Sequence, residues 1–123
     1  MLKKVAFTMF PVDDTARARA FYEGTLGLSV GLCASNGVWT EYDLPGGGCL
    51  ALFNHPNAAA KGERGTKNAS IAFEVEDLDA LMKTLQAKGV KFTSGVIKGP
   101  NCRMANIEDP EGNAIILHQL NQA

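Results

Sequence analysis

The chain has 123 residues, of which 46% are hydrophobic and 20% are charged, so it has the size and composition of one globular domain. A formal net charge of −1 gives no basic surface for nucleic acid or an anionic membrane, and no apolar run is long enough to span a bilayer. Because the first residues lack the apolar core of a signal peptide and the three cysteines lack CxxC spacing, we expect a cytoplasmic protein with free thiols and no structural zinc site.

The first half of the chain is predicted to contain four strands and one helix. Apolar stretches bounded by proline and glycine place the strands over residues 5–10, 28–33, 37–44 and 49–54. Asp13 or Asp14 is expected to cap a helix over residues 15–26, because a short side-chain oxygen accepts hydrogen bonds from the first turn. Pro11 is expected to end the first strand, and Gly27 to end the helix.

The second half repeats this order after a polar loop over residues 55–68, which is a candidate mobile flap. Its strands are predicted over residues 69–75, 91–97, 103–107 and 114–119. Between the first two, apolar residues from Leu78 to Leu85 recur at i, i+3, i+4 and i+7, which indicates a helix with one buried face. Asp77 is expected to cap this helix, and Gly89 to end it.

Each half therefore reads as a strand, a helix and three strands. Residues 7–14 begin a strand that runs into a helix, and residues 70–77 do so again. We predict an α+β fold in which two βαβββ modules in tandem form a curved mixed sheet that contains a cleft. The expected parts of this single domain are module 1 over residues 1–54, the linker loop 55–68 and module 2 over residues 69–123.

Three short motifs occur in this chain in an order typical of one protein group. They are Val12-Asp13-Asp14 followed by Phe21-Tyr22 and Leu26-Gly27-Leu28, the segment AFEVEDL over residues 72–78, and the turn DPEGN over residues 109–113. These motifs resemble the signatures of the vicinal oxygen chelate superfamily, which includes glyoxalase I, extradiol dioxygenases and bleomycin-binding resistance proteins. The resemblance covers nearly the whole chain and implies the fold, whereas a shared fold does not establish shared chemistry.

The enzymes of that superfamily resemble one another at a metal site. One ligand, usually His, Gln or Glu, comes from the first strand of each module and one from its last strand. The corresponding positions in this chain are Phe7, Ala51, Ser70 and Ile116. Aromatic and aliphatic side chains have no lone pair for a divalent metal, and a serine hydroxyl alone is a poor ligand. The sequence therefore predicts no metal and no other cofactor.

The cleft walls are predicted from strand alternation and from the superfamily's substrate-facing positions. The residues expected to bind a ligand are Phe7, Met9, Trp39, Glu41, Phe53, Ser70, Cys102, Met104, Asn106, Ile116 and His118, with Ala51, Ala72 and Glu74 on the same walls. This mainly apolar set is typical of a small-molecule pocket and equally of a collapsed core. Trp39 can stack on a planar or cationic group, or be buried in a core or an interface. An inward Glu41 suits a cationic ligand, whereas Glu74 is expected at a solvated strand end.

Three hypotheses for function are open. The first, which we favour, is a binding protein that holds a small molecule in a metal-free hydrophobic cleft. The second is a metal-independent isomerase, lyase or hydrolase of a small carbonyl substrate that uses His118, Glu41 or Cys102. Histidine titrates near neutral pH, so His118 is a candidate general base, and Cys102 is a candidate nucleophile with His118 as its base. The third is a structural role, with the cleft filled by its own side chains.

The quaternary structure is predicted from the size of the chain. One chain of 123 residues leaves sheet edges and apolar surface to cover, so we expect a homodimer. The cleft can be closed within one chain or between two chains. The expected partner is a small molecule of unknown identity.

Overall fold

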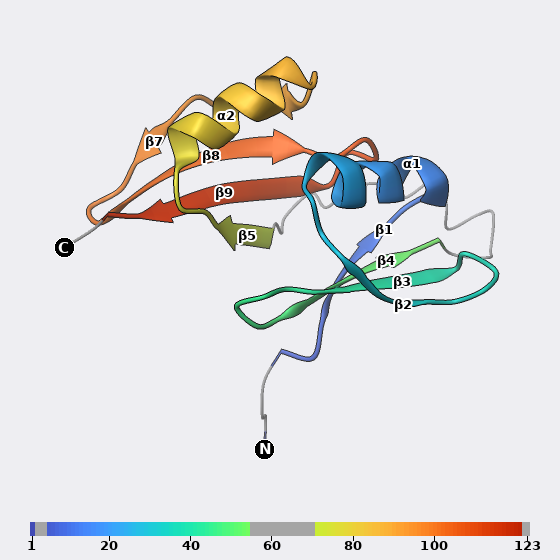
Figure 1. The fold of residues 1–123 in the computed structure, drawn as a ribbon. Helices are drawn as coiled ribbons and strands as arrows, with labels where there is room; N and C mark the ends of the chain where they lie inside the picture. Colours follow the sequence, from blue (N-terminus) through green and yellow to red (C-terminus); the bar gives the residue numbers. More distant parts are fainter. Residues whose placement is uncertain (2–4, 55–70, 122–123) are drawn as a thin grey trace. The chain divides into compact units, whose positions relative to one another are not determined.

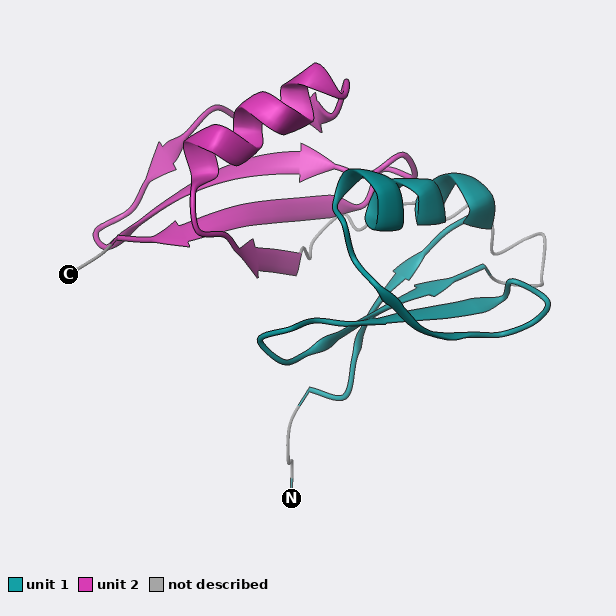
Figure 2. Cartoon of the chain, viewed as in Figure 1, with its two compact units in different colours: residues 1–65 teal, residues 66–123 magenta. Residues whose placement is uncertain are grey.

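The computed structural model describes residues 1, 5–54 and 71–121 (Figure 1). The chain divides into two compact units, Met1–Gly65 and Thr66–Ala123, and each builds its own mixed sheet (Figure 2). The predicted α+β fold is confirmed. The predicted flap over residues 55–68 lies outside the described residues. No helix in the described part of the chain is long and apolar enough to span a membrane.

Unit 1 follows the predicted order of one strand, one helix and three strands. Its elements are β1 Thr8–Pro11, α1 Thr15–Arg19, the π-helix η1 Ala20–Thr25, β2 Val30–Cys33, β3 Trp39–Asp43 and β4 Cys49–Phe53. The strands lie in the order β1-β4-β3-β2, with β1 parallel to β4 and the other pairs antiparallel. The first and last strands of the unit are therefore direct neighbours.

Two details of unit 1 differ from the sequence-based expectation. The helix predicted over residues 15–26 is α-helical only to Arg19 and continues as a π-helix. Arg19 and Tyr42 both donate to the carboxylate of Glu23, at 2.6 Å and 2.9 Å, which fixes the π-helix against β3. Strand β1 begins at Thr8 rather than at residue 5, and it ends at Pro11, as predicted.

The core of unit 1 lies between the helical segment and one face of the sheet. Phe10, Tyr42 and Leu52 point to that face and are at most 1% exposed. The ring of Tyr22 on the π-helix lies 5.9 Å from the ring of Tyr42. Since side chains alternate along a strand, this core determines which side chains point to the opposite face.

Unit 2 contains one more strand than predicted. Its elements are β5 Ile71–Glu74, α2 Leu78–Ala87, β6 Lys91–Phe92, β7 Ile97–Lys98, β8 Cys102–Glu108 and β9 Ala114–Leu120. The strands lie in the order β5-β9-β8-β6, and β7 also pairs with β8. The strand predicted over residues 91–97 is divided because Ser94 Oγ accepts the backbone N–H of Asn106, at 2.9 Å, between the two short ladders.

Helix α2 covers one face of the sheet in unit 2 (Figure 1). Ile115 and Leu117 point to this face and are at most 2% exposed, which confirms the predicted alternation along the last strand. Gln119, on the same face, accepts the backbone N–H of Leu78 through its Oε1 at 2.7 Å and so ties the start of the helix to β9. The side chains between them, including His118, point to the other face.

The turn between β8 and β9 is held by one buried aspartate. Asp109 Oδ1 accepts the backbone N–H groups of Glu111 and Asn113, both at 2.8 Å, and its Oδ2 accepts the Asn113 side-chain amide at 2.8 Å. Gly112 has a φ of 82°, which other residues rarely adopt. These contacts explain the DPEGN sequence and place β9 against β8.

We predict that Asp109→Ala lowers the free energy of unfolding by about 2–4 kcal/mol, because it leaves buried N–H donors without an acceptor. Urea unfolding followed by circular dichroism measures the loss. Asp77→Ala is the matched control, because it removes an exposed helix cap that accepts from Ala80 N and should cost only about 1 kcal/mol. Equal losses in the two variants would contradict this account of the turn.

Candidate functional site

In unit 1 the predicted ligand residues share the sheet face opposite the helix. The strand register sets Met9 and Glu41 on either side of Ala51, and Trp39 beside Phe53. Directly paired residues of neighbouring strands point to the same face. This face is partly open, since the Met9 side chain is 42% exposed, whereas Ala51 at its centre is buried.

An aromatic cluster with one carboxylate occupies this face. The Trp39 ring lies 5.2 Å from Phe7 in an edge-to-face arrangement and 5.9 Å from Phe53. Trp39 Nε1 donates to Glu41 Oε2 at 2.6 Å, so the indole is held in one orientation. The structure therefore brings together the predicted residues Phe7, Trp39, Glu41 and Phe53.

Sequence reasoning missed two residues on this face. Leu32 pairs with Glu41 and is 58% exposed, but an irregularity between Val30 and Leu32 disturbs simple alternation along β2. Cys49 donates its thiol to Glu41 Oε1 at 3.7 Å. Burial first, and then the charges of Glu41 and Asp43, raise the pKa of the Cys49 thiol, so it keeps its proton. The two-residue spacing from Cys49 to Ala51 is the signal that could have found it.

In unit 2 the predicted ligand residues share the face opposite α2. The central strand β9 carries Ile116 and His118 on this face. Ala72 and Asn106 pair with Ile116 from either side, and Glu74 and Met104 pair with His118. Cys102 follows at the end of β8, where it pairs with Leu120. The predicted residue Ser70 lies outside the described residues.

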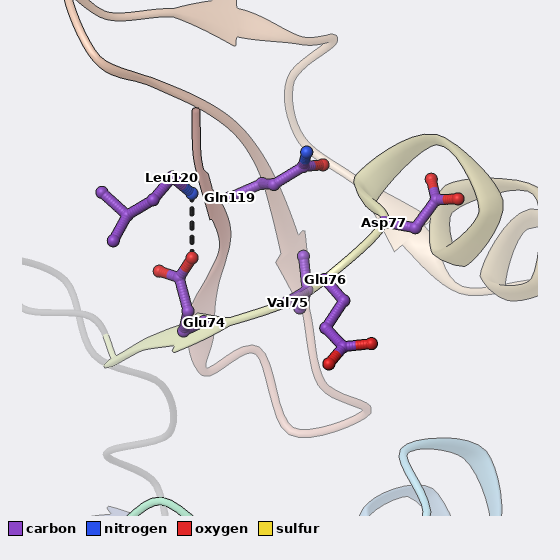
Figure 3. Close-up of a pocket in the computed structure, with 6 residues that line it drawn as sticks. All are labelled: Glu74, Val75, Glu76, Asp77, Gln119 and Leu120. Carbon is purple, nitrogen blue, oxygen red and sulfur yellow. Dashed lines mark hydrogen bonds between the residues drawn. The ribbon is translucent and has the colours of Figure 1, made fainter. Parts of the chain in front are cut away.

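The imidazole of His118 is paired with the carboxylate of Glu74. His118 Nδ1 lies 2.7 Å from Glu74 Oε1. The backbone N–H of Leu120 donates to Glu74 Oε2 at 2.8 Å (Figure 3). His118 first, and then Leu120, hold the pKa of Glu74 below its ordinary value of 4.5. Over residues 5–54 and 71–121, no hydrogen bond joins His118 to Cys102, so the structure provides a carboxylate rather than a thiol as its partner.

A polar hollow of about 570 Å³ lies beside Glu74, at the end of β5 (Figure 3). Its walls are formed by Glu74, Val75, Glu76, Asp77, Gln119 and Leu120. Two of its polar side chains already have partners in the fold. Asp77 caps α2, and Gln119 accepts the backbone N–H of Leu78. The carboxylates of Glu74, Glu76 and Asp77 make the lining of this hollow negatively charged.

The arrangement of the chain matches known proteins over nearly its full length. The model of the Glyoxalase/Bleomycin resistance protein/Dioxygenase superfamily matches residues 4–117. The chain belongs to this superfamily. A lactoylglutathione lyase of Haemophilus influenzae is 30% identical to it over 124 residues, with 91% of this chain and 89% of that protein covered.

Two solved structures are similar to this chain in both sequence and fold. TnmS3, an antibiotic binding protein from Streptomyces sp. CB03234, is 27% identical with a TM-score of 0.78, and 98% of each chain is covered. A superfamily member from Sphaerobacter thermophilus is also 27% identical with a TM-score of 0.80, covering 97% of this chain and 98% of that one.

The positions that hold a metal in enzymes of the superfamily do not suit a metal here. The registers make Met9 with Ala51 in unit 1 equivalent to Ala72 with Ile116 in unit 2, which supports the internal alignment. Phe7, Ala51 and Ile116 provide no lone pair. Among residues 5–54 and 71–121, no three or more His, Cys, Asp or Glu side chains are grouped to hold a metal ion. Three of the four predicted ligand positions therefore provide no donor for the superfamily's metal, and the fourth, Ser70, lies outside the described residues.

We predict that His118→Ala raises the pKa of Glu74 toward its ordinary value of 4.5, because the largest cause of its lowering is removed. The remaining bond from Leu120 keeps part of the effect. Carbon-13 NMR of the glutamate and aspartate carboxyl groups as a function of pH measures the change. Asp79 is the internal control, since Arg103 lowers its pKa on the opposite sheet face. An unchanged Glu74 midpoint beside an unchanged Asp79 would show that His118 is not its partner in solution.

Proposed function

We propose that this protein binds a small molecule without a metal ion, on the aromatic sheet face of unit 1. The observation that carries the proposal is the Trp39 indole, which is bonded to the Glu41 carboxylate and flanked by Phe7 and Phe53. The ligand proposed is flat and apolar and bears a cationic or hydrogen-bond-donating group. We call this surface the Trp39 face, formed by Phe7, Met9, Leu32, Trp39, Glu41, Ala51 and Phe53.

Stacking and charge both favour such a ligand. Phe7 and Met9 are 47% and 42% exposed, which is costly for large apolar side chains unless something covers them. Aromatic rings attract cations over their faces, by about 0.5–2 kcal/mol depending on solvation. Among the described residues, Glu41 Oε1 accepts only a long contact from the Cys49 thiol, so it retains capacity for a stronger donor.

One of the similar proteins supports binding as the role of this chain. TnmS3, 27% identical to this chain, is an antibiotic binding protein. The Haemophilus influenzae relative is a lactoylglutathione lyase, but the metal-ligand positions that serve enzymes of the superfamily carry Phe7, Ala51 and Ile116 here. We therefore propose ligand binding for this chain in preference to metal-dependent lyase chemistry.

We propose that the protein acts as a cytoplasmic homodimer. The thiols of Cys33, Cys49 and Cys102 are free, as suits a reducing compartment. Strand β2 is exposed along its whole length at one edge of its sheet, and Val30 and Leu32 on it are 41% and 58% exposed. Exposed apolar edge strands are usually covered.

Sedimentation equilibrium at micromolar concentration tests the dimer. The expected mass is twice the 13.1 kDa of one chain. Leu32→Lys should shift the equilibrium toward monomer, because it places a charge on the β2 edge. A wild-type protein that sediments as a 13.1 kDa monomer would contradict the proposal.

We predict that 9-aminoacridine, a flat cation at neutral pH, quenches the fluorescence of Trp39, the only tryptophan. The anion 9-anthracenecarboxylate should bind far more weakly, because Glu41 repels it. Glu41→Gln keeps an acceptor for the indole and removes the charge, so it should weaken 9-aminoacridine binding about 10-fold.

Glu76→Gln in unit 2 is the matched control and should leave this binding unchanged. Added Zn²⁺ or Ni²⁺ should not alter the affinity if the site works without a metal. Equal affinity for cation and anion in the wild-type protein, or equal affinity of wild type and Glu41→Gln, would refute a carboxylate-assisted site.

A further inference from the structure

We infer that the open sheet face of unit 2 is a metal-independent proton-transfer site for a small, uncharged carbonyl compound. In this site His118 is the general base, Glu74 positions it, and Asn106 binds the substrate oxygen. The inference uses residues of unit 2 only, so it does not depend on ligand binding at the Trp39 face.

The pairing of His118 determines which ring nitrogen is free to act. Glu74 Oε1 accepts from Nδ1 at 2.7 Å, so the neutral imidazole carries its proton on Nδ1 and has a lone pair on Nε2. In the described part of the chain Nε2 has no hydrogen-bond partner. The carboxylate is itself fixed, because Leu120 N donates to its other oxygen at 2.8 Å. A base held by an anchored carboxylate is the arrangement that orients catalytic histidines in hydrolases.

Asn106 supplies the second polar group on this face. Its side-chain Oδ1 is buried and has no hydrogen-bond partner among the described residues. A buried amide atom without a hydrogen-bond partner is costly, so a ligand group that forms this hydrogen bond binds favourably. A half rotation of the amide exchanges its oxygen and nitrogen, so the same position can donate to a carbonyl or accept from an enol hydroxyl.

The register places these groups at a spacing that one small molecule can bridge. Asn106 pairs with Ile116, and Met104 pairs with His118, so Asn106 and His118 are diagonal neighbours on adjacent strands. Such neighbours are about 7–8 Å apart along the sheet. The apolar side chains of Ile116 and Met104 are the other two members of this group of four neighbours. They reduce the local dielectric constant around the proton transfer.

The charge of the surroundings selects the substrate. Glu74 lies at this face, and Glu76 and Asp77 line the hollow beside it. An anionic substrate would be repelled by these carboxylates, whereas an uncharged ketone would not. The substrate class is therefore a small neutral carbonyl compound with an acidic C–H next to the carbonyl.

The reaction balances without a co-reactant. The α C–H bond breaks, its proton passes to His118 Nε2, and its electron pair forms the C=C bond of an enolate whose oxygen is bound by Asn106. Glu74 stabilises the resulting imidazolium. The proton then returns from Nε2 to the same carbon, which gives exchange or racemisation, or to another atom of the enolate, which gives an isomer.

Deuterium exchange tests the activity without knowledge of the natural substrate. Hydroxyacetone and pentane-2,4-dione are incubated with the full-length protein in D₂O, and the loss of their α-proton signals is followed by proton NMR. We expect the wild-type protein to exceed an equal concentration of imidazole at least 10-fold with one of the two probes, since positioned bases contribute about 10²–10⁴-fold. A rate no greater than that of imidazole with both probes would overturn the inference.

Variants separate the three roles. His118→Ala should return the rate to background, and Asn106→Ala should lower it at least 10-fold. Glu74→Gln should lower it at least 10-fold, whereas Asp79→Asn, which removes a carboxylate bonded to Arg103 on the opposite sheet face, should leave it unchanged. A His118→Ala variant that remains folded and as active as the wild type would overturn the assignment of the base.

The tautomer of His118 gives a readout that does not depend on any probe. Nitrogen-15 NMR of the two histidines should show neutral His118 protonated on Nδ1 in the wild-type protein, with the His118→Ala spectrum providing the assignment. Glu74→Ala should shift the population toward protonation on Nε2. A wild-type His118 protonated on Nε2 would overturn the positioning role of Glu74, even if the variant itself failed to fold.

Discussion

The parallel pairing of the first strand with the last strand is the constraint on which each unit depends. It sets Met9 beside Ala51 in unit 1 and Ala72 beside Ile116 in unit 2. Because side chains alternate, this register decides which residues pack under the helix and which point to the open face. A slip of one residue would exchange the two sets, so burial of the core also holds the open face in place.

The same constraint gives the two open faces different chemistry at equivalent positions. The pair formed by Glu74 and His118 in unit 2 corresponds in register to Pro11 and Phe53 in unit 1. Where unit 2 has a hydrogen-bonded carboxylate and imidazole, unit 1 has an aromatic ring packed against Trp39. One backbone arrangement, used twice, therefore supports a stacking surface in one unit and a polar pair in the other.

Local patterns predicted much of this arrangement, and contacts between distant residues determined the rest. Alternation along the last strand predicted the burial of Ile115 and Leu117, and the duplicated motifs predicted the order of elements. The π-helix depends on a bond from Tyr42 to Glu23, 19 residues away, which no helical pattern encodes.

Contacts between residues far apart in the sequence also determine the geometry of the candidate sites. The division of the strand at Ser94 depends on a bond to Asn106, 12 residues on, and the pair formed by Glu74 and His118 spans 44 residues. Alternation could place these residues on a face, but it could not specify which of their atoms would meet.

The carboxylates on the two open faces are held in place by protein donors. A carboxylate on a partly buried face needs donors, and in metal enzymes the cation fills that need. Here Glu41 accepts from the Trp39 indole and the Cys49 thiol, and Glu74 is paired with His118 and accepts from the Leu120 backbone. Each carboxylate is held by protein groups within its own unit, and Glu41 Oε1, with its long contact from the Cys49 thiol, keeps capacity for a further donor. Their negative charge is therefore available for the proposed recognition of a cation in unit 1 and the proposed proton transfer in unit 2.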